Sequence, residues 1–194
     1  MNEMTLTLLL SQRTLPPGWY ERLMQGRPRP AQVNLFCLAQ ATHLLGTDFS
    51  SLSPGHRGYC AYSHRLLGAP PPGADSPFAA GNLLTLGGMV RHSHLTLSVP
   101  HSHWPVAMGE PGVKKIGILL GDDPDTQRES IRLATGLAGC NHLVNLYSPL
   151  EMPELRMLLP ETCSLLEALE AMKAEFTLMG TEPPPGTDEL LLQL

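Results

Sequence analysis

Four of the eight histidines fall into two His-Ser-His pairs, at residues 92–94 and 101–103. Imidazole is the commonest transition-metal ligand in proteins. Side chains two residues apart in an extended strand leave on the same face, so one such pair can offer two nitrogens to one ion. We therefore expect a site for iron, zinc or copper with four ligands: His92, His94, His101 and His103.

A cysteine and a histidine four residues apart form a second candidate site. If residues 59–67 make a short helix closed by Gly68, Cys60 and His64 lie on one face and could bind a metal, a haem or an iron–sulfur cluster. Cys60 could instead be a catalytic thiolate, activated by His64 or Arg65. One buried thiol beside one surface imidazole also fits this spacing. We expect Cys60 to be the most thiolate-like of the four cysteines.

Hydrophobic periodicity predicts the elements that position these residues. A strand is expected at 5–10. A helix is expected at 31–45, where apolar residues recur at helical spacing and place Cys37 in the core. Residues 89–99 predict a strand with leucine and valine on one face and both histidines of the first pair on the other. Around these elements the first half is rich in Gly and Pro, which indicates loops.

The second half alternates strand and helix more regularly. The apolar run at 113–121 is typical of a strand covered on both faces. Asp123 can cap the next helix, with Pro124 at its first position and Gly139 at its end. The remaining expected elements are a strand at 143–147, a helix at 160–176 and a strand at 176–179.

This alternation predicts an α/β protein. Residues 111–194 should form a βαβ-type region, in which a small parallel sheet has flanking helices and right-handed crossovers. Residues 1–110 should form a loop-rich α/β region that carries seven of the eight histidines and two of the four cysteines. We expect the two regions to pack as one compact unit.

Composition excludes several classes of protein. A formal net charge of −5, from 13 Lys and Arg against 18 Asp and Glu, argues against nucleic-acid binding. The apolar run at 4–10 is too short for a membrane span or a signal-peptide core. Four cysteines without a short paired spacing favour reduced thiols. We therefore expect a cytoplasmic protein.

Parts of the chain resemble a prokaryotic domain family of unknown function that has two separated cysteines in its first half. Cys37 and Cys60 match those cysteines, and Leu67 and Gly68 follow the second one. The resemblance covers about half of the chain and implies no activity.

Residues 115–147 are similar to the opening β-α-β unit of the DsrE-like sulfur-relay proteins, a unit shared by flavodoxin-like folds. That resemblance implies a persulfide-carrying cysteine after the third strand, near Gly180 and Thr181. No cysteine stands there, which counts against sulfur transfer from that position.

Three functions follow from these observations. The favoured hypothesis is a protein that binds a transition metal or a metal cofactor, such as haem or an iron–sulfur cluster, in an accessory or redox role. The second is a cysteine-based sulfur or thiol relay that uses Cys60. The third is a non-catalytic subunit whose Leu-rich and Pro-rich segments bind a protein partner or a second copy of the chain. The sequence leaves open whether any reaction is catalysed.

Overall fold

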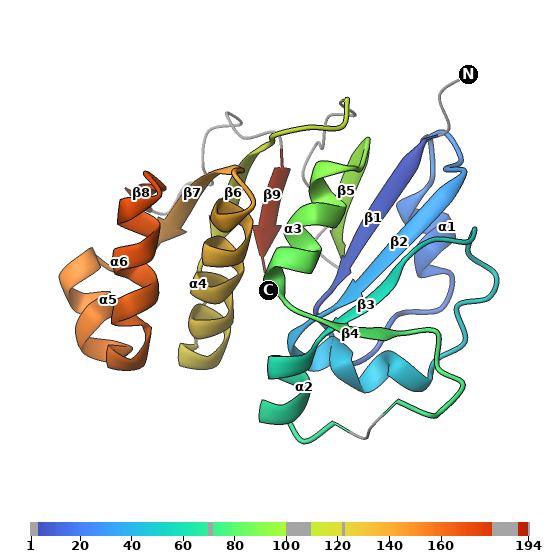
Figure 1. Cartoon of the computed structure of the whole chain (residues 1–194), viewed down its shortest axis with the longest axis horizontal. Coiled ribbons are helices and arrows are strands. Elements are labelled where there is room, and N and C mark those ends of the chain that lie inside the picture. Colours follow the sequence, from blue (N-terminus) through green and yellow to red (C-terminus); the bar gives the residue numbers. More distant parts are fainter. Residues whose placement is uncertain (1–3, 70–71, 100–109, 122, 180–189, 194) are drawn as a thin grey trace.

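The computed structural model describes residues 4–69, 72–99, 110–121, 123–179 and 190–193 (Figure 1).

Short apolar runs form the strands of a first parallel sheet. The first sheet has the order β4-β3-β2-β1-β5. Its strands are β1 (Thr5–Leu10), β2 (Gln32–Cys37), β3 (Arg57–Cys60), β4 (Ala79–Gly81) and β5 (Leu95–Val99).

A second parallel sheet follows in the chain, with the order β8-β7-β6-β9. Strands β5 and β9 lie side by side where the two sheets meet (Figure 1). The strands of this sheet are β6 (Lys115–Leu119), β7 (Leu143–Ser148), β8 (Glu175–Leu178) and β9 (Leu190–Gln193).

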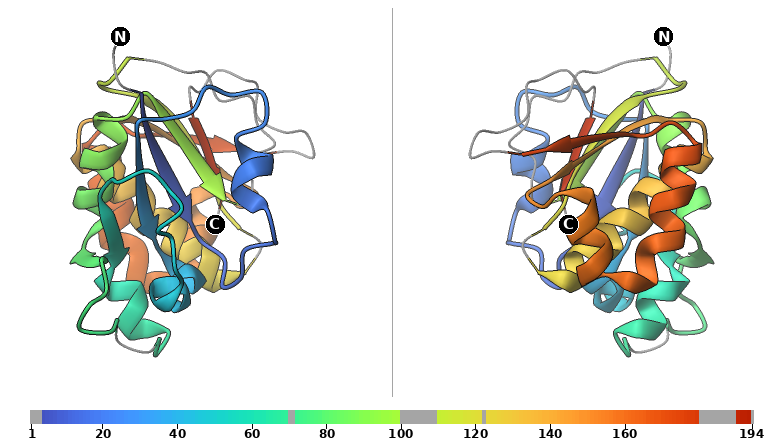
Figure 2. Two further views of the ribbon diagram at one scale, coloured as in Figure 1. Left: turned by 90° about the vertical axis from the view of Figure 1, so that its right-hand side faces the viewer. Right: turned by 90° about the vertical axis from the view of Figure 1, so that its left-hand side faces the viewer.

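Helices connect these strands and cover the sheets. Helices α3, α4 and α6 lie on one face, and α1 lies on the opposite face of the first sheet (Figure 2). Two segments are 3-10 helices, η1 (Ala39–Gly46) and η2 (Pro160–Thr162). The α-helices are α1 (Trp19–Leu23), α2 (Ala61–Leu66), α3 (Leu83–Arg91), α4 (Pro124–Gly139), α5 (Met152–Leu158) and α6 (Cys163–Ala171).

The central strands β1 and β2 send alternate side chains to two apolar clusters. Leu9 and Phe36 pack in the cluster that includes α3 and α4, whereas Leu8 and Leu35 pack in the cluster on the α1 side. All four side chains are fully buried. The centre of the sheet is therefore covered on both faces, which explains why β1 and β2 are mainly apolar.

The two sheets repeat one strand plan, since the order β3-β2-β1-β5 matches β8-β7-β6-β9. Strand β2 reads Val-Asn-Leu-Phe-Cys at 33–37, and β7 reads Val-Asn-Leu-Tyr-Ser at 144–148. Asn34 pairs with Thr7 of β1, and Asn145 pairs with Gly117 of β6, so the two asparagines are equivalent.

The side chain of each asparagine also accepts a hydrogen bond from the side of the third strand of its sheet. Oδ1 of Asn34 accepts a 2.9 Å hydrogen bond from the backbone N–H of His56, just before β3. Oδ1 of Asn145 accepts a 3.0 Å bond from the hydroxyl of Thr177 in β8. Each bond therefore ties the second strand of its sheet to the third, which supports an internal repeat.

Close approach of α3 and α4 joins the two halves. A Cβ atom at Gly87 would lie 2.5 Å from Sγ of Cys140, and one at Gly136 would lie 2.2 Å from Cβ of Leu83. Nε2 of the buried His142 lies 3.0 Å from the carbonyl oxygen of Gly87, while its Nδ1 accepts a 3.1 Å bond from the backbone N–H of Lys114. Because Nδ1 accepts, Nε2 is the nitrogen that donates.

The predicted α/β class with parallel sheets is confirmed, as are the strands expected at 5–10, 113–121 and 143–147. Helix α4 begins as expected, because Oδ1 of Asp123 accepts bonds from two first-turn backbone N–H groups and Pro124 is the first helical residue. The strand expected at 176–179 is β8, which begins one residue earlier.

The helix predicted at 31–45 is wrong. Residues 32–37 are β2, and η1 begins only at Ala39, whose φ of 48° lies in the left-handed region. Because β2 is buried on both faces, most of its residues are apolar, and a mainly apolar run also satisfies helical spacing.

Three further predictions need correction. The helix expected at 59–67 starts at Ala61, because Tyr59 and Cys60 belong to β3. The strand expected at 89–99 starts at Leu95, because α3 continues to Arg91 from a capping box. The helix expected at 160–176 is η2 followed by α6 and ends at Ala171, and α5 was not predicted.

The first half is also more regular than expected, since it holds the larger sheet. None of the helices in the described residues is both long and apolar enough to cross a bilayer.

Candidate functional site

Cys60 is the last residue of β3 and immediately precedes α2. Strand β3 pairs in parallel with β2 and β4, so Cys60 lies at the carboxyl edge of the sheet, where open α/β folds place their ligand and catalytic residues. Its side chain points into the cluster that contains α3 and α4 and is 2% exposed. The candidate catalytic thiol therefore lies on the face where the two halves pack.

A polar cluster ties the first turn of α2 to α4. The hydroxyl of Ser63 donates a 2.8 Å hydrogen bond to Oε2 of Glu129. Oε1 of Glu129 is buried without a hydrogen-bond partner among the described residues, and Nε of Arg132 lies 3.8 Å away. The guanidinium of Arg132 stacks on Tyr62, with Cζ 3.5 Å from the ring centroid. A carboxylate with one unbonded oxygen is thus enclosed next to the helix that Cys60 precedes.

His64 packs against Tyr59, the residue before Cys60. Its ring lies 5.2 Å from the ring of Tyr59, at an interplanar angle of 58°. Tyr59 packs with the α1-side cluster, whereas Cys60, the next residue in β3, packs with the opposite one. The helical spacing on which the Cys60–His64 pair was predicted therefore does not apply, because Cys60 belongs to the strand.

His92 and His94 lie at the other end of the sheet. His92 is the C-cap of α3, and its Nδ1 lies 2.7 Å from the carbonyl oxygen of Gly88. His94 precedes β5, and its Nδ1 accepts a 3.1 Å bond from the backbone N–H of Thr5 at the start of β1. Both imidazoles are bonded to backbone at the amino edge of the sheet, opposite the edge that holds Cys60.

Two of the four predicted metal ligands, His92 and His94, belong to the described part of the chain. There, no three side chains of His, Cys, Asp or Glu gather closely enough to hold a metal ion. His101 and His103 lie outside the described residues. The four-histidine site therefore stays a prediction.

The other cysteines differ from Cys60 in position. Cys37 is fully buried, as predicted, and burial raises the pKa of its thiol to about 12. Cys140 follows α4, and Cys163 begins α6; both are partly exposed. Sγ of Cys140 donates to the carbonyl oxygen of Leu84 at 3.3 Å.

Sequence reasoning missed Glu129. The signal was present, because Glu129 stands four residues before Leu133 and seven before Gly136, on the buried side of α4. A carboxylate on an apolar helical face needs a buried partner, and that partner is Ser63. Only the fold reveals the pairing, since 66 residues separate the two.

No protein-family model matches the chain, and no curated protein sequence is significantly similar to it.

Proposed function

We propose that the protein is a sulfur-relay protein that carries a transferable sulfur atom as a persulfide on Cys60. The observation that carries the proposal is the place of Cys60 in the internal repeat. Leu35 pairs with Arg57 at the start of β3, and Leu146 pairs with Phe176 in β8. Counting forward along each strand makes Met179 the counterpart of Cys60.

The DsrE-like resemblance of the second half implies a cysteine just after the third strand, beside Met179. Because the two halves repeat one strand plan, we expect the same cysteine position at the end of the third strand of the first half. That strand is β3, and Cys60 is its last residue. The absence of a cysteine at that position in the second half then no longer argues against sulfur transfer, because the first half supplies one at the equivalent position.

The proposed reaction is a thiol exchange that balances without a further oxidant. The thiolate of Cys60 attacks the outer sulfur of a donor persulfide, the sulfur–sulfur bond of the donor breaks, and the donor leaves as a thiolate. Cys60 then holds the outer sulfur as its own persulfide. An acceptor thiolate then attacks the outer sulfur of the Cys60 persulfide. The sulfur–sulfur bond breaks, the acceptor keeps the outer sulfur as a persulfide, and Cys60 leaves as a thiolate.

Burial of Cys60 suits a carrier. A side chain that is 2% exposed keeps a bound persulfide away from water and from unrelated thiols. Transfer then requires α2 to move, and this helix is only six residues long. The Ser63–Glu129 bond holds its first turn against α4, so we assign Ser63 and Glu129 as positioning residues.

Loading of the protein with a small-molecule persulfide, such as glutathione persulfide, tests the proposal. After iodoacetamide trapping, peptide mass spectrometry should find one added sulfur atom on the Cys60 peptide. Cys60→Ala should remove the signal, and Cys163→Ala should retain it. Loading spread over Cys140 and Cys163, or unchanged in Cys60→Ala, would reject Cys60 as the carrier.

A further inference from the structure

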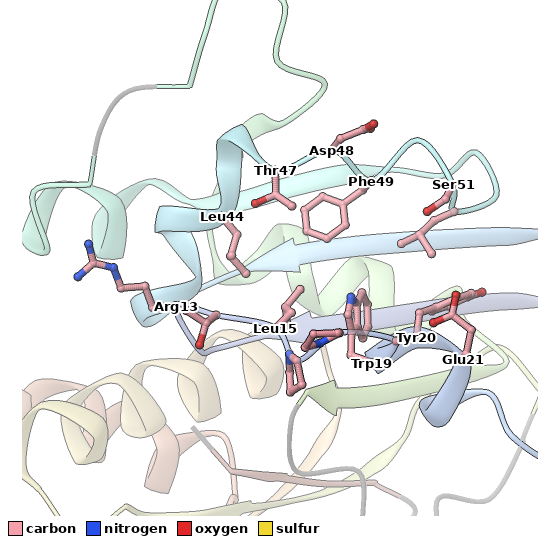
Figure 3. Close-up of a pocket in the computed structure, with 15 residues that line it drawn as sticks. Arg13, Leu15, Trp19, Tyr20, Glu21, Leu44, Thr47, Asp48, Phe49 and Ser51 are labelled. Carbon is pink, nitrogen blue, oxygen red and sulfur yellow. The ribbon is translucent and has the colours of Figure 1, made fainter.

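An open cavity of about 450 Å³ lies beside the carboxyl end of β1, on the α1 side of the first sheet and away from the face that contains Cys60. Residues 13–21 form one wall, and six residues between positions 44 and 52 form the other (Figure 3). Three aromatic rings line it, from Trp19, Tyr20 and Phe49. Aromatic rings concentrated in one small cavity indicate a binding site.

Two of these rings form a corner. The ring centroids of Trp19 and Tyr20 lie 5.7 Å apart, and their planes meet at 68°. Figure 3 shows Phe49 facing Trp19 from the opposite wall. Phe49 is buried and packs edge-on against Phe78 at 5.9 Å, so this third ring is held in place.

The charges around the rings favour a cation. Glu21 and Asp48 both line the cavity. The backbone N–H of Ser50 donates to Oδ1 of Asp48 at 2.8 Å, which lowers the pKa of that carboxyl and keeps it ionised at neutral pH. The carboxylate of Asp48 and the guanidinium of Arg13, which also lines the cavity, both point away from the rings (Figure 3), so the lining carries two carboxylates against one guanidinium.

We infer that this aromatic cavity binds a small organic cation, of the quaternary ammonium or methylated amine class. The faces of aromatic rings are the negative ends of their quadrupoles, and several faces around one cation attract it together. Methyl groups make such a cation weakly hydrated and match the apolar side chains of Leu15 and Leu44, which face each other beside the rings. The net negative charge of the lining adds attraction that a neutral ligand does not receive.

The sharpest test compares choline with 3,3-dimethyl-1-butanol, which has nearly the same shape and no charge. Isothermal titration calorimetry of the full chain should show choline binding and at least about tenfold weaker binding of the neutral alcohol. Equal binding of both compounds would mean that the cavity is an apolar crevice, and the inference would be wrong. Absence of choline binding at tens of millimolar would also overturn it.

Choline binding by single-substitution variants then tests whether the cation binds at these rings. Trp19→Leu keeps an apolar side chain but removes the largest ring face, and it should weaken choline binding about tenfold. Glu21→Gln should weaken binding less, and its effect should shrink at high salt. Tyr62→Leu removes an aromatic ring on α2, outside the cavity, and should leave binding unchanged. Choline binding that survives Trp19→Leu unchanged would place the cation elsewhere.

Discussion

The hydroxyl of Ser63 in α2 lies 2.8 Å from Oε2 of Glu129 in α4, and this buried bond joins the helix after Cys60 to the second half of the chain. Ser63 is 1% exposed and Glu129 is 7% exposed. Because neither group can turn to water, the bond fixes how α2 sits over the end of β3. Access to Cys60 is therefore coupled to the contact between the halves.

Ser63→Ala should loosen α2. It leaves a second oxygen of the buried Glu129 carboxylate without a partner, so the free energy of unfolding should fall by about 1–3 kcal/mol. Alkylation of Cys60 in the native protein should become faster, because α2 opens more often. Denaturant unfolding and mass spectrometry of iodoacetamide-treated protein measure the two effects.

Cys163 in the same sample is the internal control for that experiment. It lies in α6, so its labelling rate should not change. Unchanged labelling of Cys60 in Ser63→Ala would show that the Ser63–Glu129 bond does not control access to the thiol.

Gly87 and Gly88 are neighbours in α3 and should respond differently to alanine. A Cβ atom at Gly87 would lie 2.5 Å from Sγ of Cys140, whereas one at Gly88 meets nothing within 4 Å. Gly87→Ala should destabilise the protein by about 1–3 kcal/mol, because α3 must move away from α4. Gly88→Ala should be neutral or stabilise by up to about 1 kcal/mol, because alanine favours the helix. Similar thermal unfolding of both variants would mean that α3 and α4 do not pack this closely.

Because the thiol of Cys37 is buried, we predict that the free energy of unfolding falls at high pH. Burial raises the pKa of its thiol from 9.0 to about 12. Below pH 9.0 the thiol is protonated in both folded and unfolded chains, so its contribution is fully present. Between pH 9.0 and about 12 only the unfolded chain ionises, and stability should decline by up to about 1.4 kcal/mol per pH unit.

Comparison with Cys37→Ala isolates this contribution from the other groups that titrate at high pH. The variant should be less stable at neutral pH, because it leaves a cavity, but its stability should decline less steeply above pH 9.0. Parallel pH profiles for the two proteins would show that Cys37 ionises as readily in the folded chain as in the unfolded one.

Metal binding by His92 and His94 can be tested separately from sulfur transfer. Replacing His92 and His94 together by alanine should abolish any stoichiometric metal binding, because two imidazoles leave one coordination sphere. The fold should survive with a small loss of stability, about 1 kcal/mol, since Nδ1 of His94 accepts only one bond from Thr5. Metal analysis and circular dichroism of the same samples decide the matter. Full metal content in the variant, or no metal uptake by the natural chain, would remove these histidines as ligands.

Local signals in the sequence were sufficient for much of the second half. Strand β6 is an apolar run, and Asp123 with Pro124 is a helix start that depends on neighbouring residues alone. The same rules failed at β2, because burial on both faces erases the alternation that distinguishes a strand from a helix. They also failed at α3, where the Asn82 capping box starts a helix that extends into the supposed strand.

The candidate site was predicted only in part. Cys60 was identified from its neighbours in the chain, although its place at the end of a strand was not. Glu129 and the equivalence of Cys60 with Met179 depend on contacts and strand pairing between distant residues. Such contacts arise from the packing of the halves, and no short window of sequence contains them.

Sulfur transfer by a variant that keeps Cys60 as its sole cysteine is the most direct test of the proposed function. Cys37, Cys140 and Cys163 would be replaced by alanine, and circular dichroism would confirm the fold. The variant would be loaded with glutathione persulfide, freed of donor and mixed with a thiol acceptor. We predict one sulfur atom bound per chain and its transfer to the acceptor, with neither step occurring after Cys60→Ser is added. A sole-cysteine variant that folds but takes up no sulfur, or transfer that persists after Cys60→Ser, would contradict a relay at Cys60.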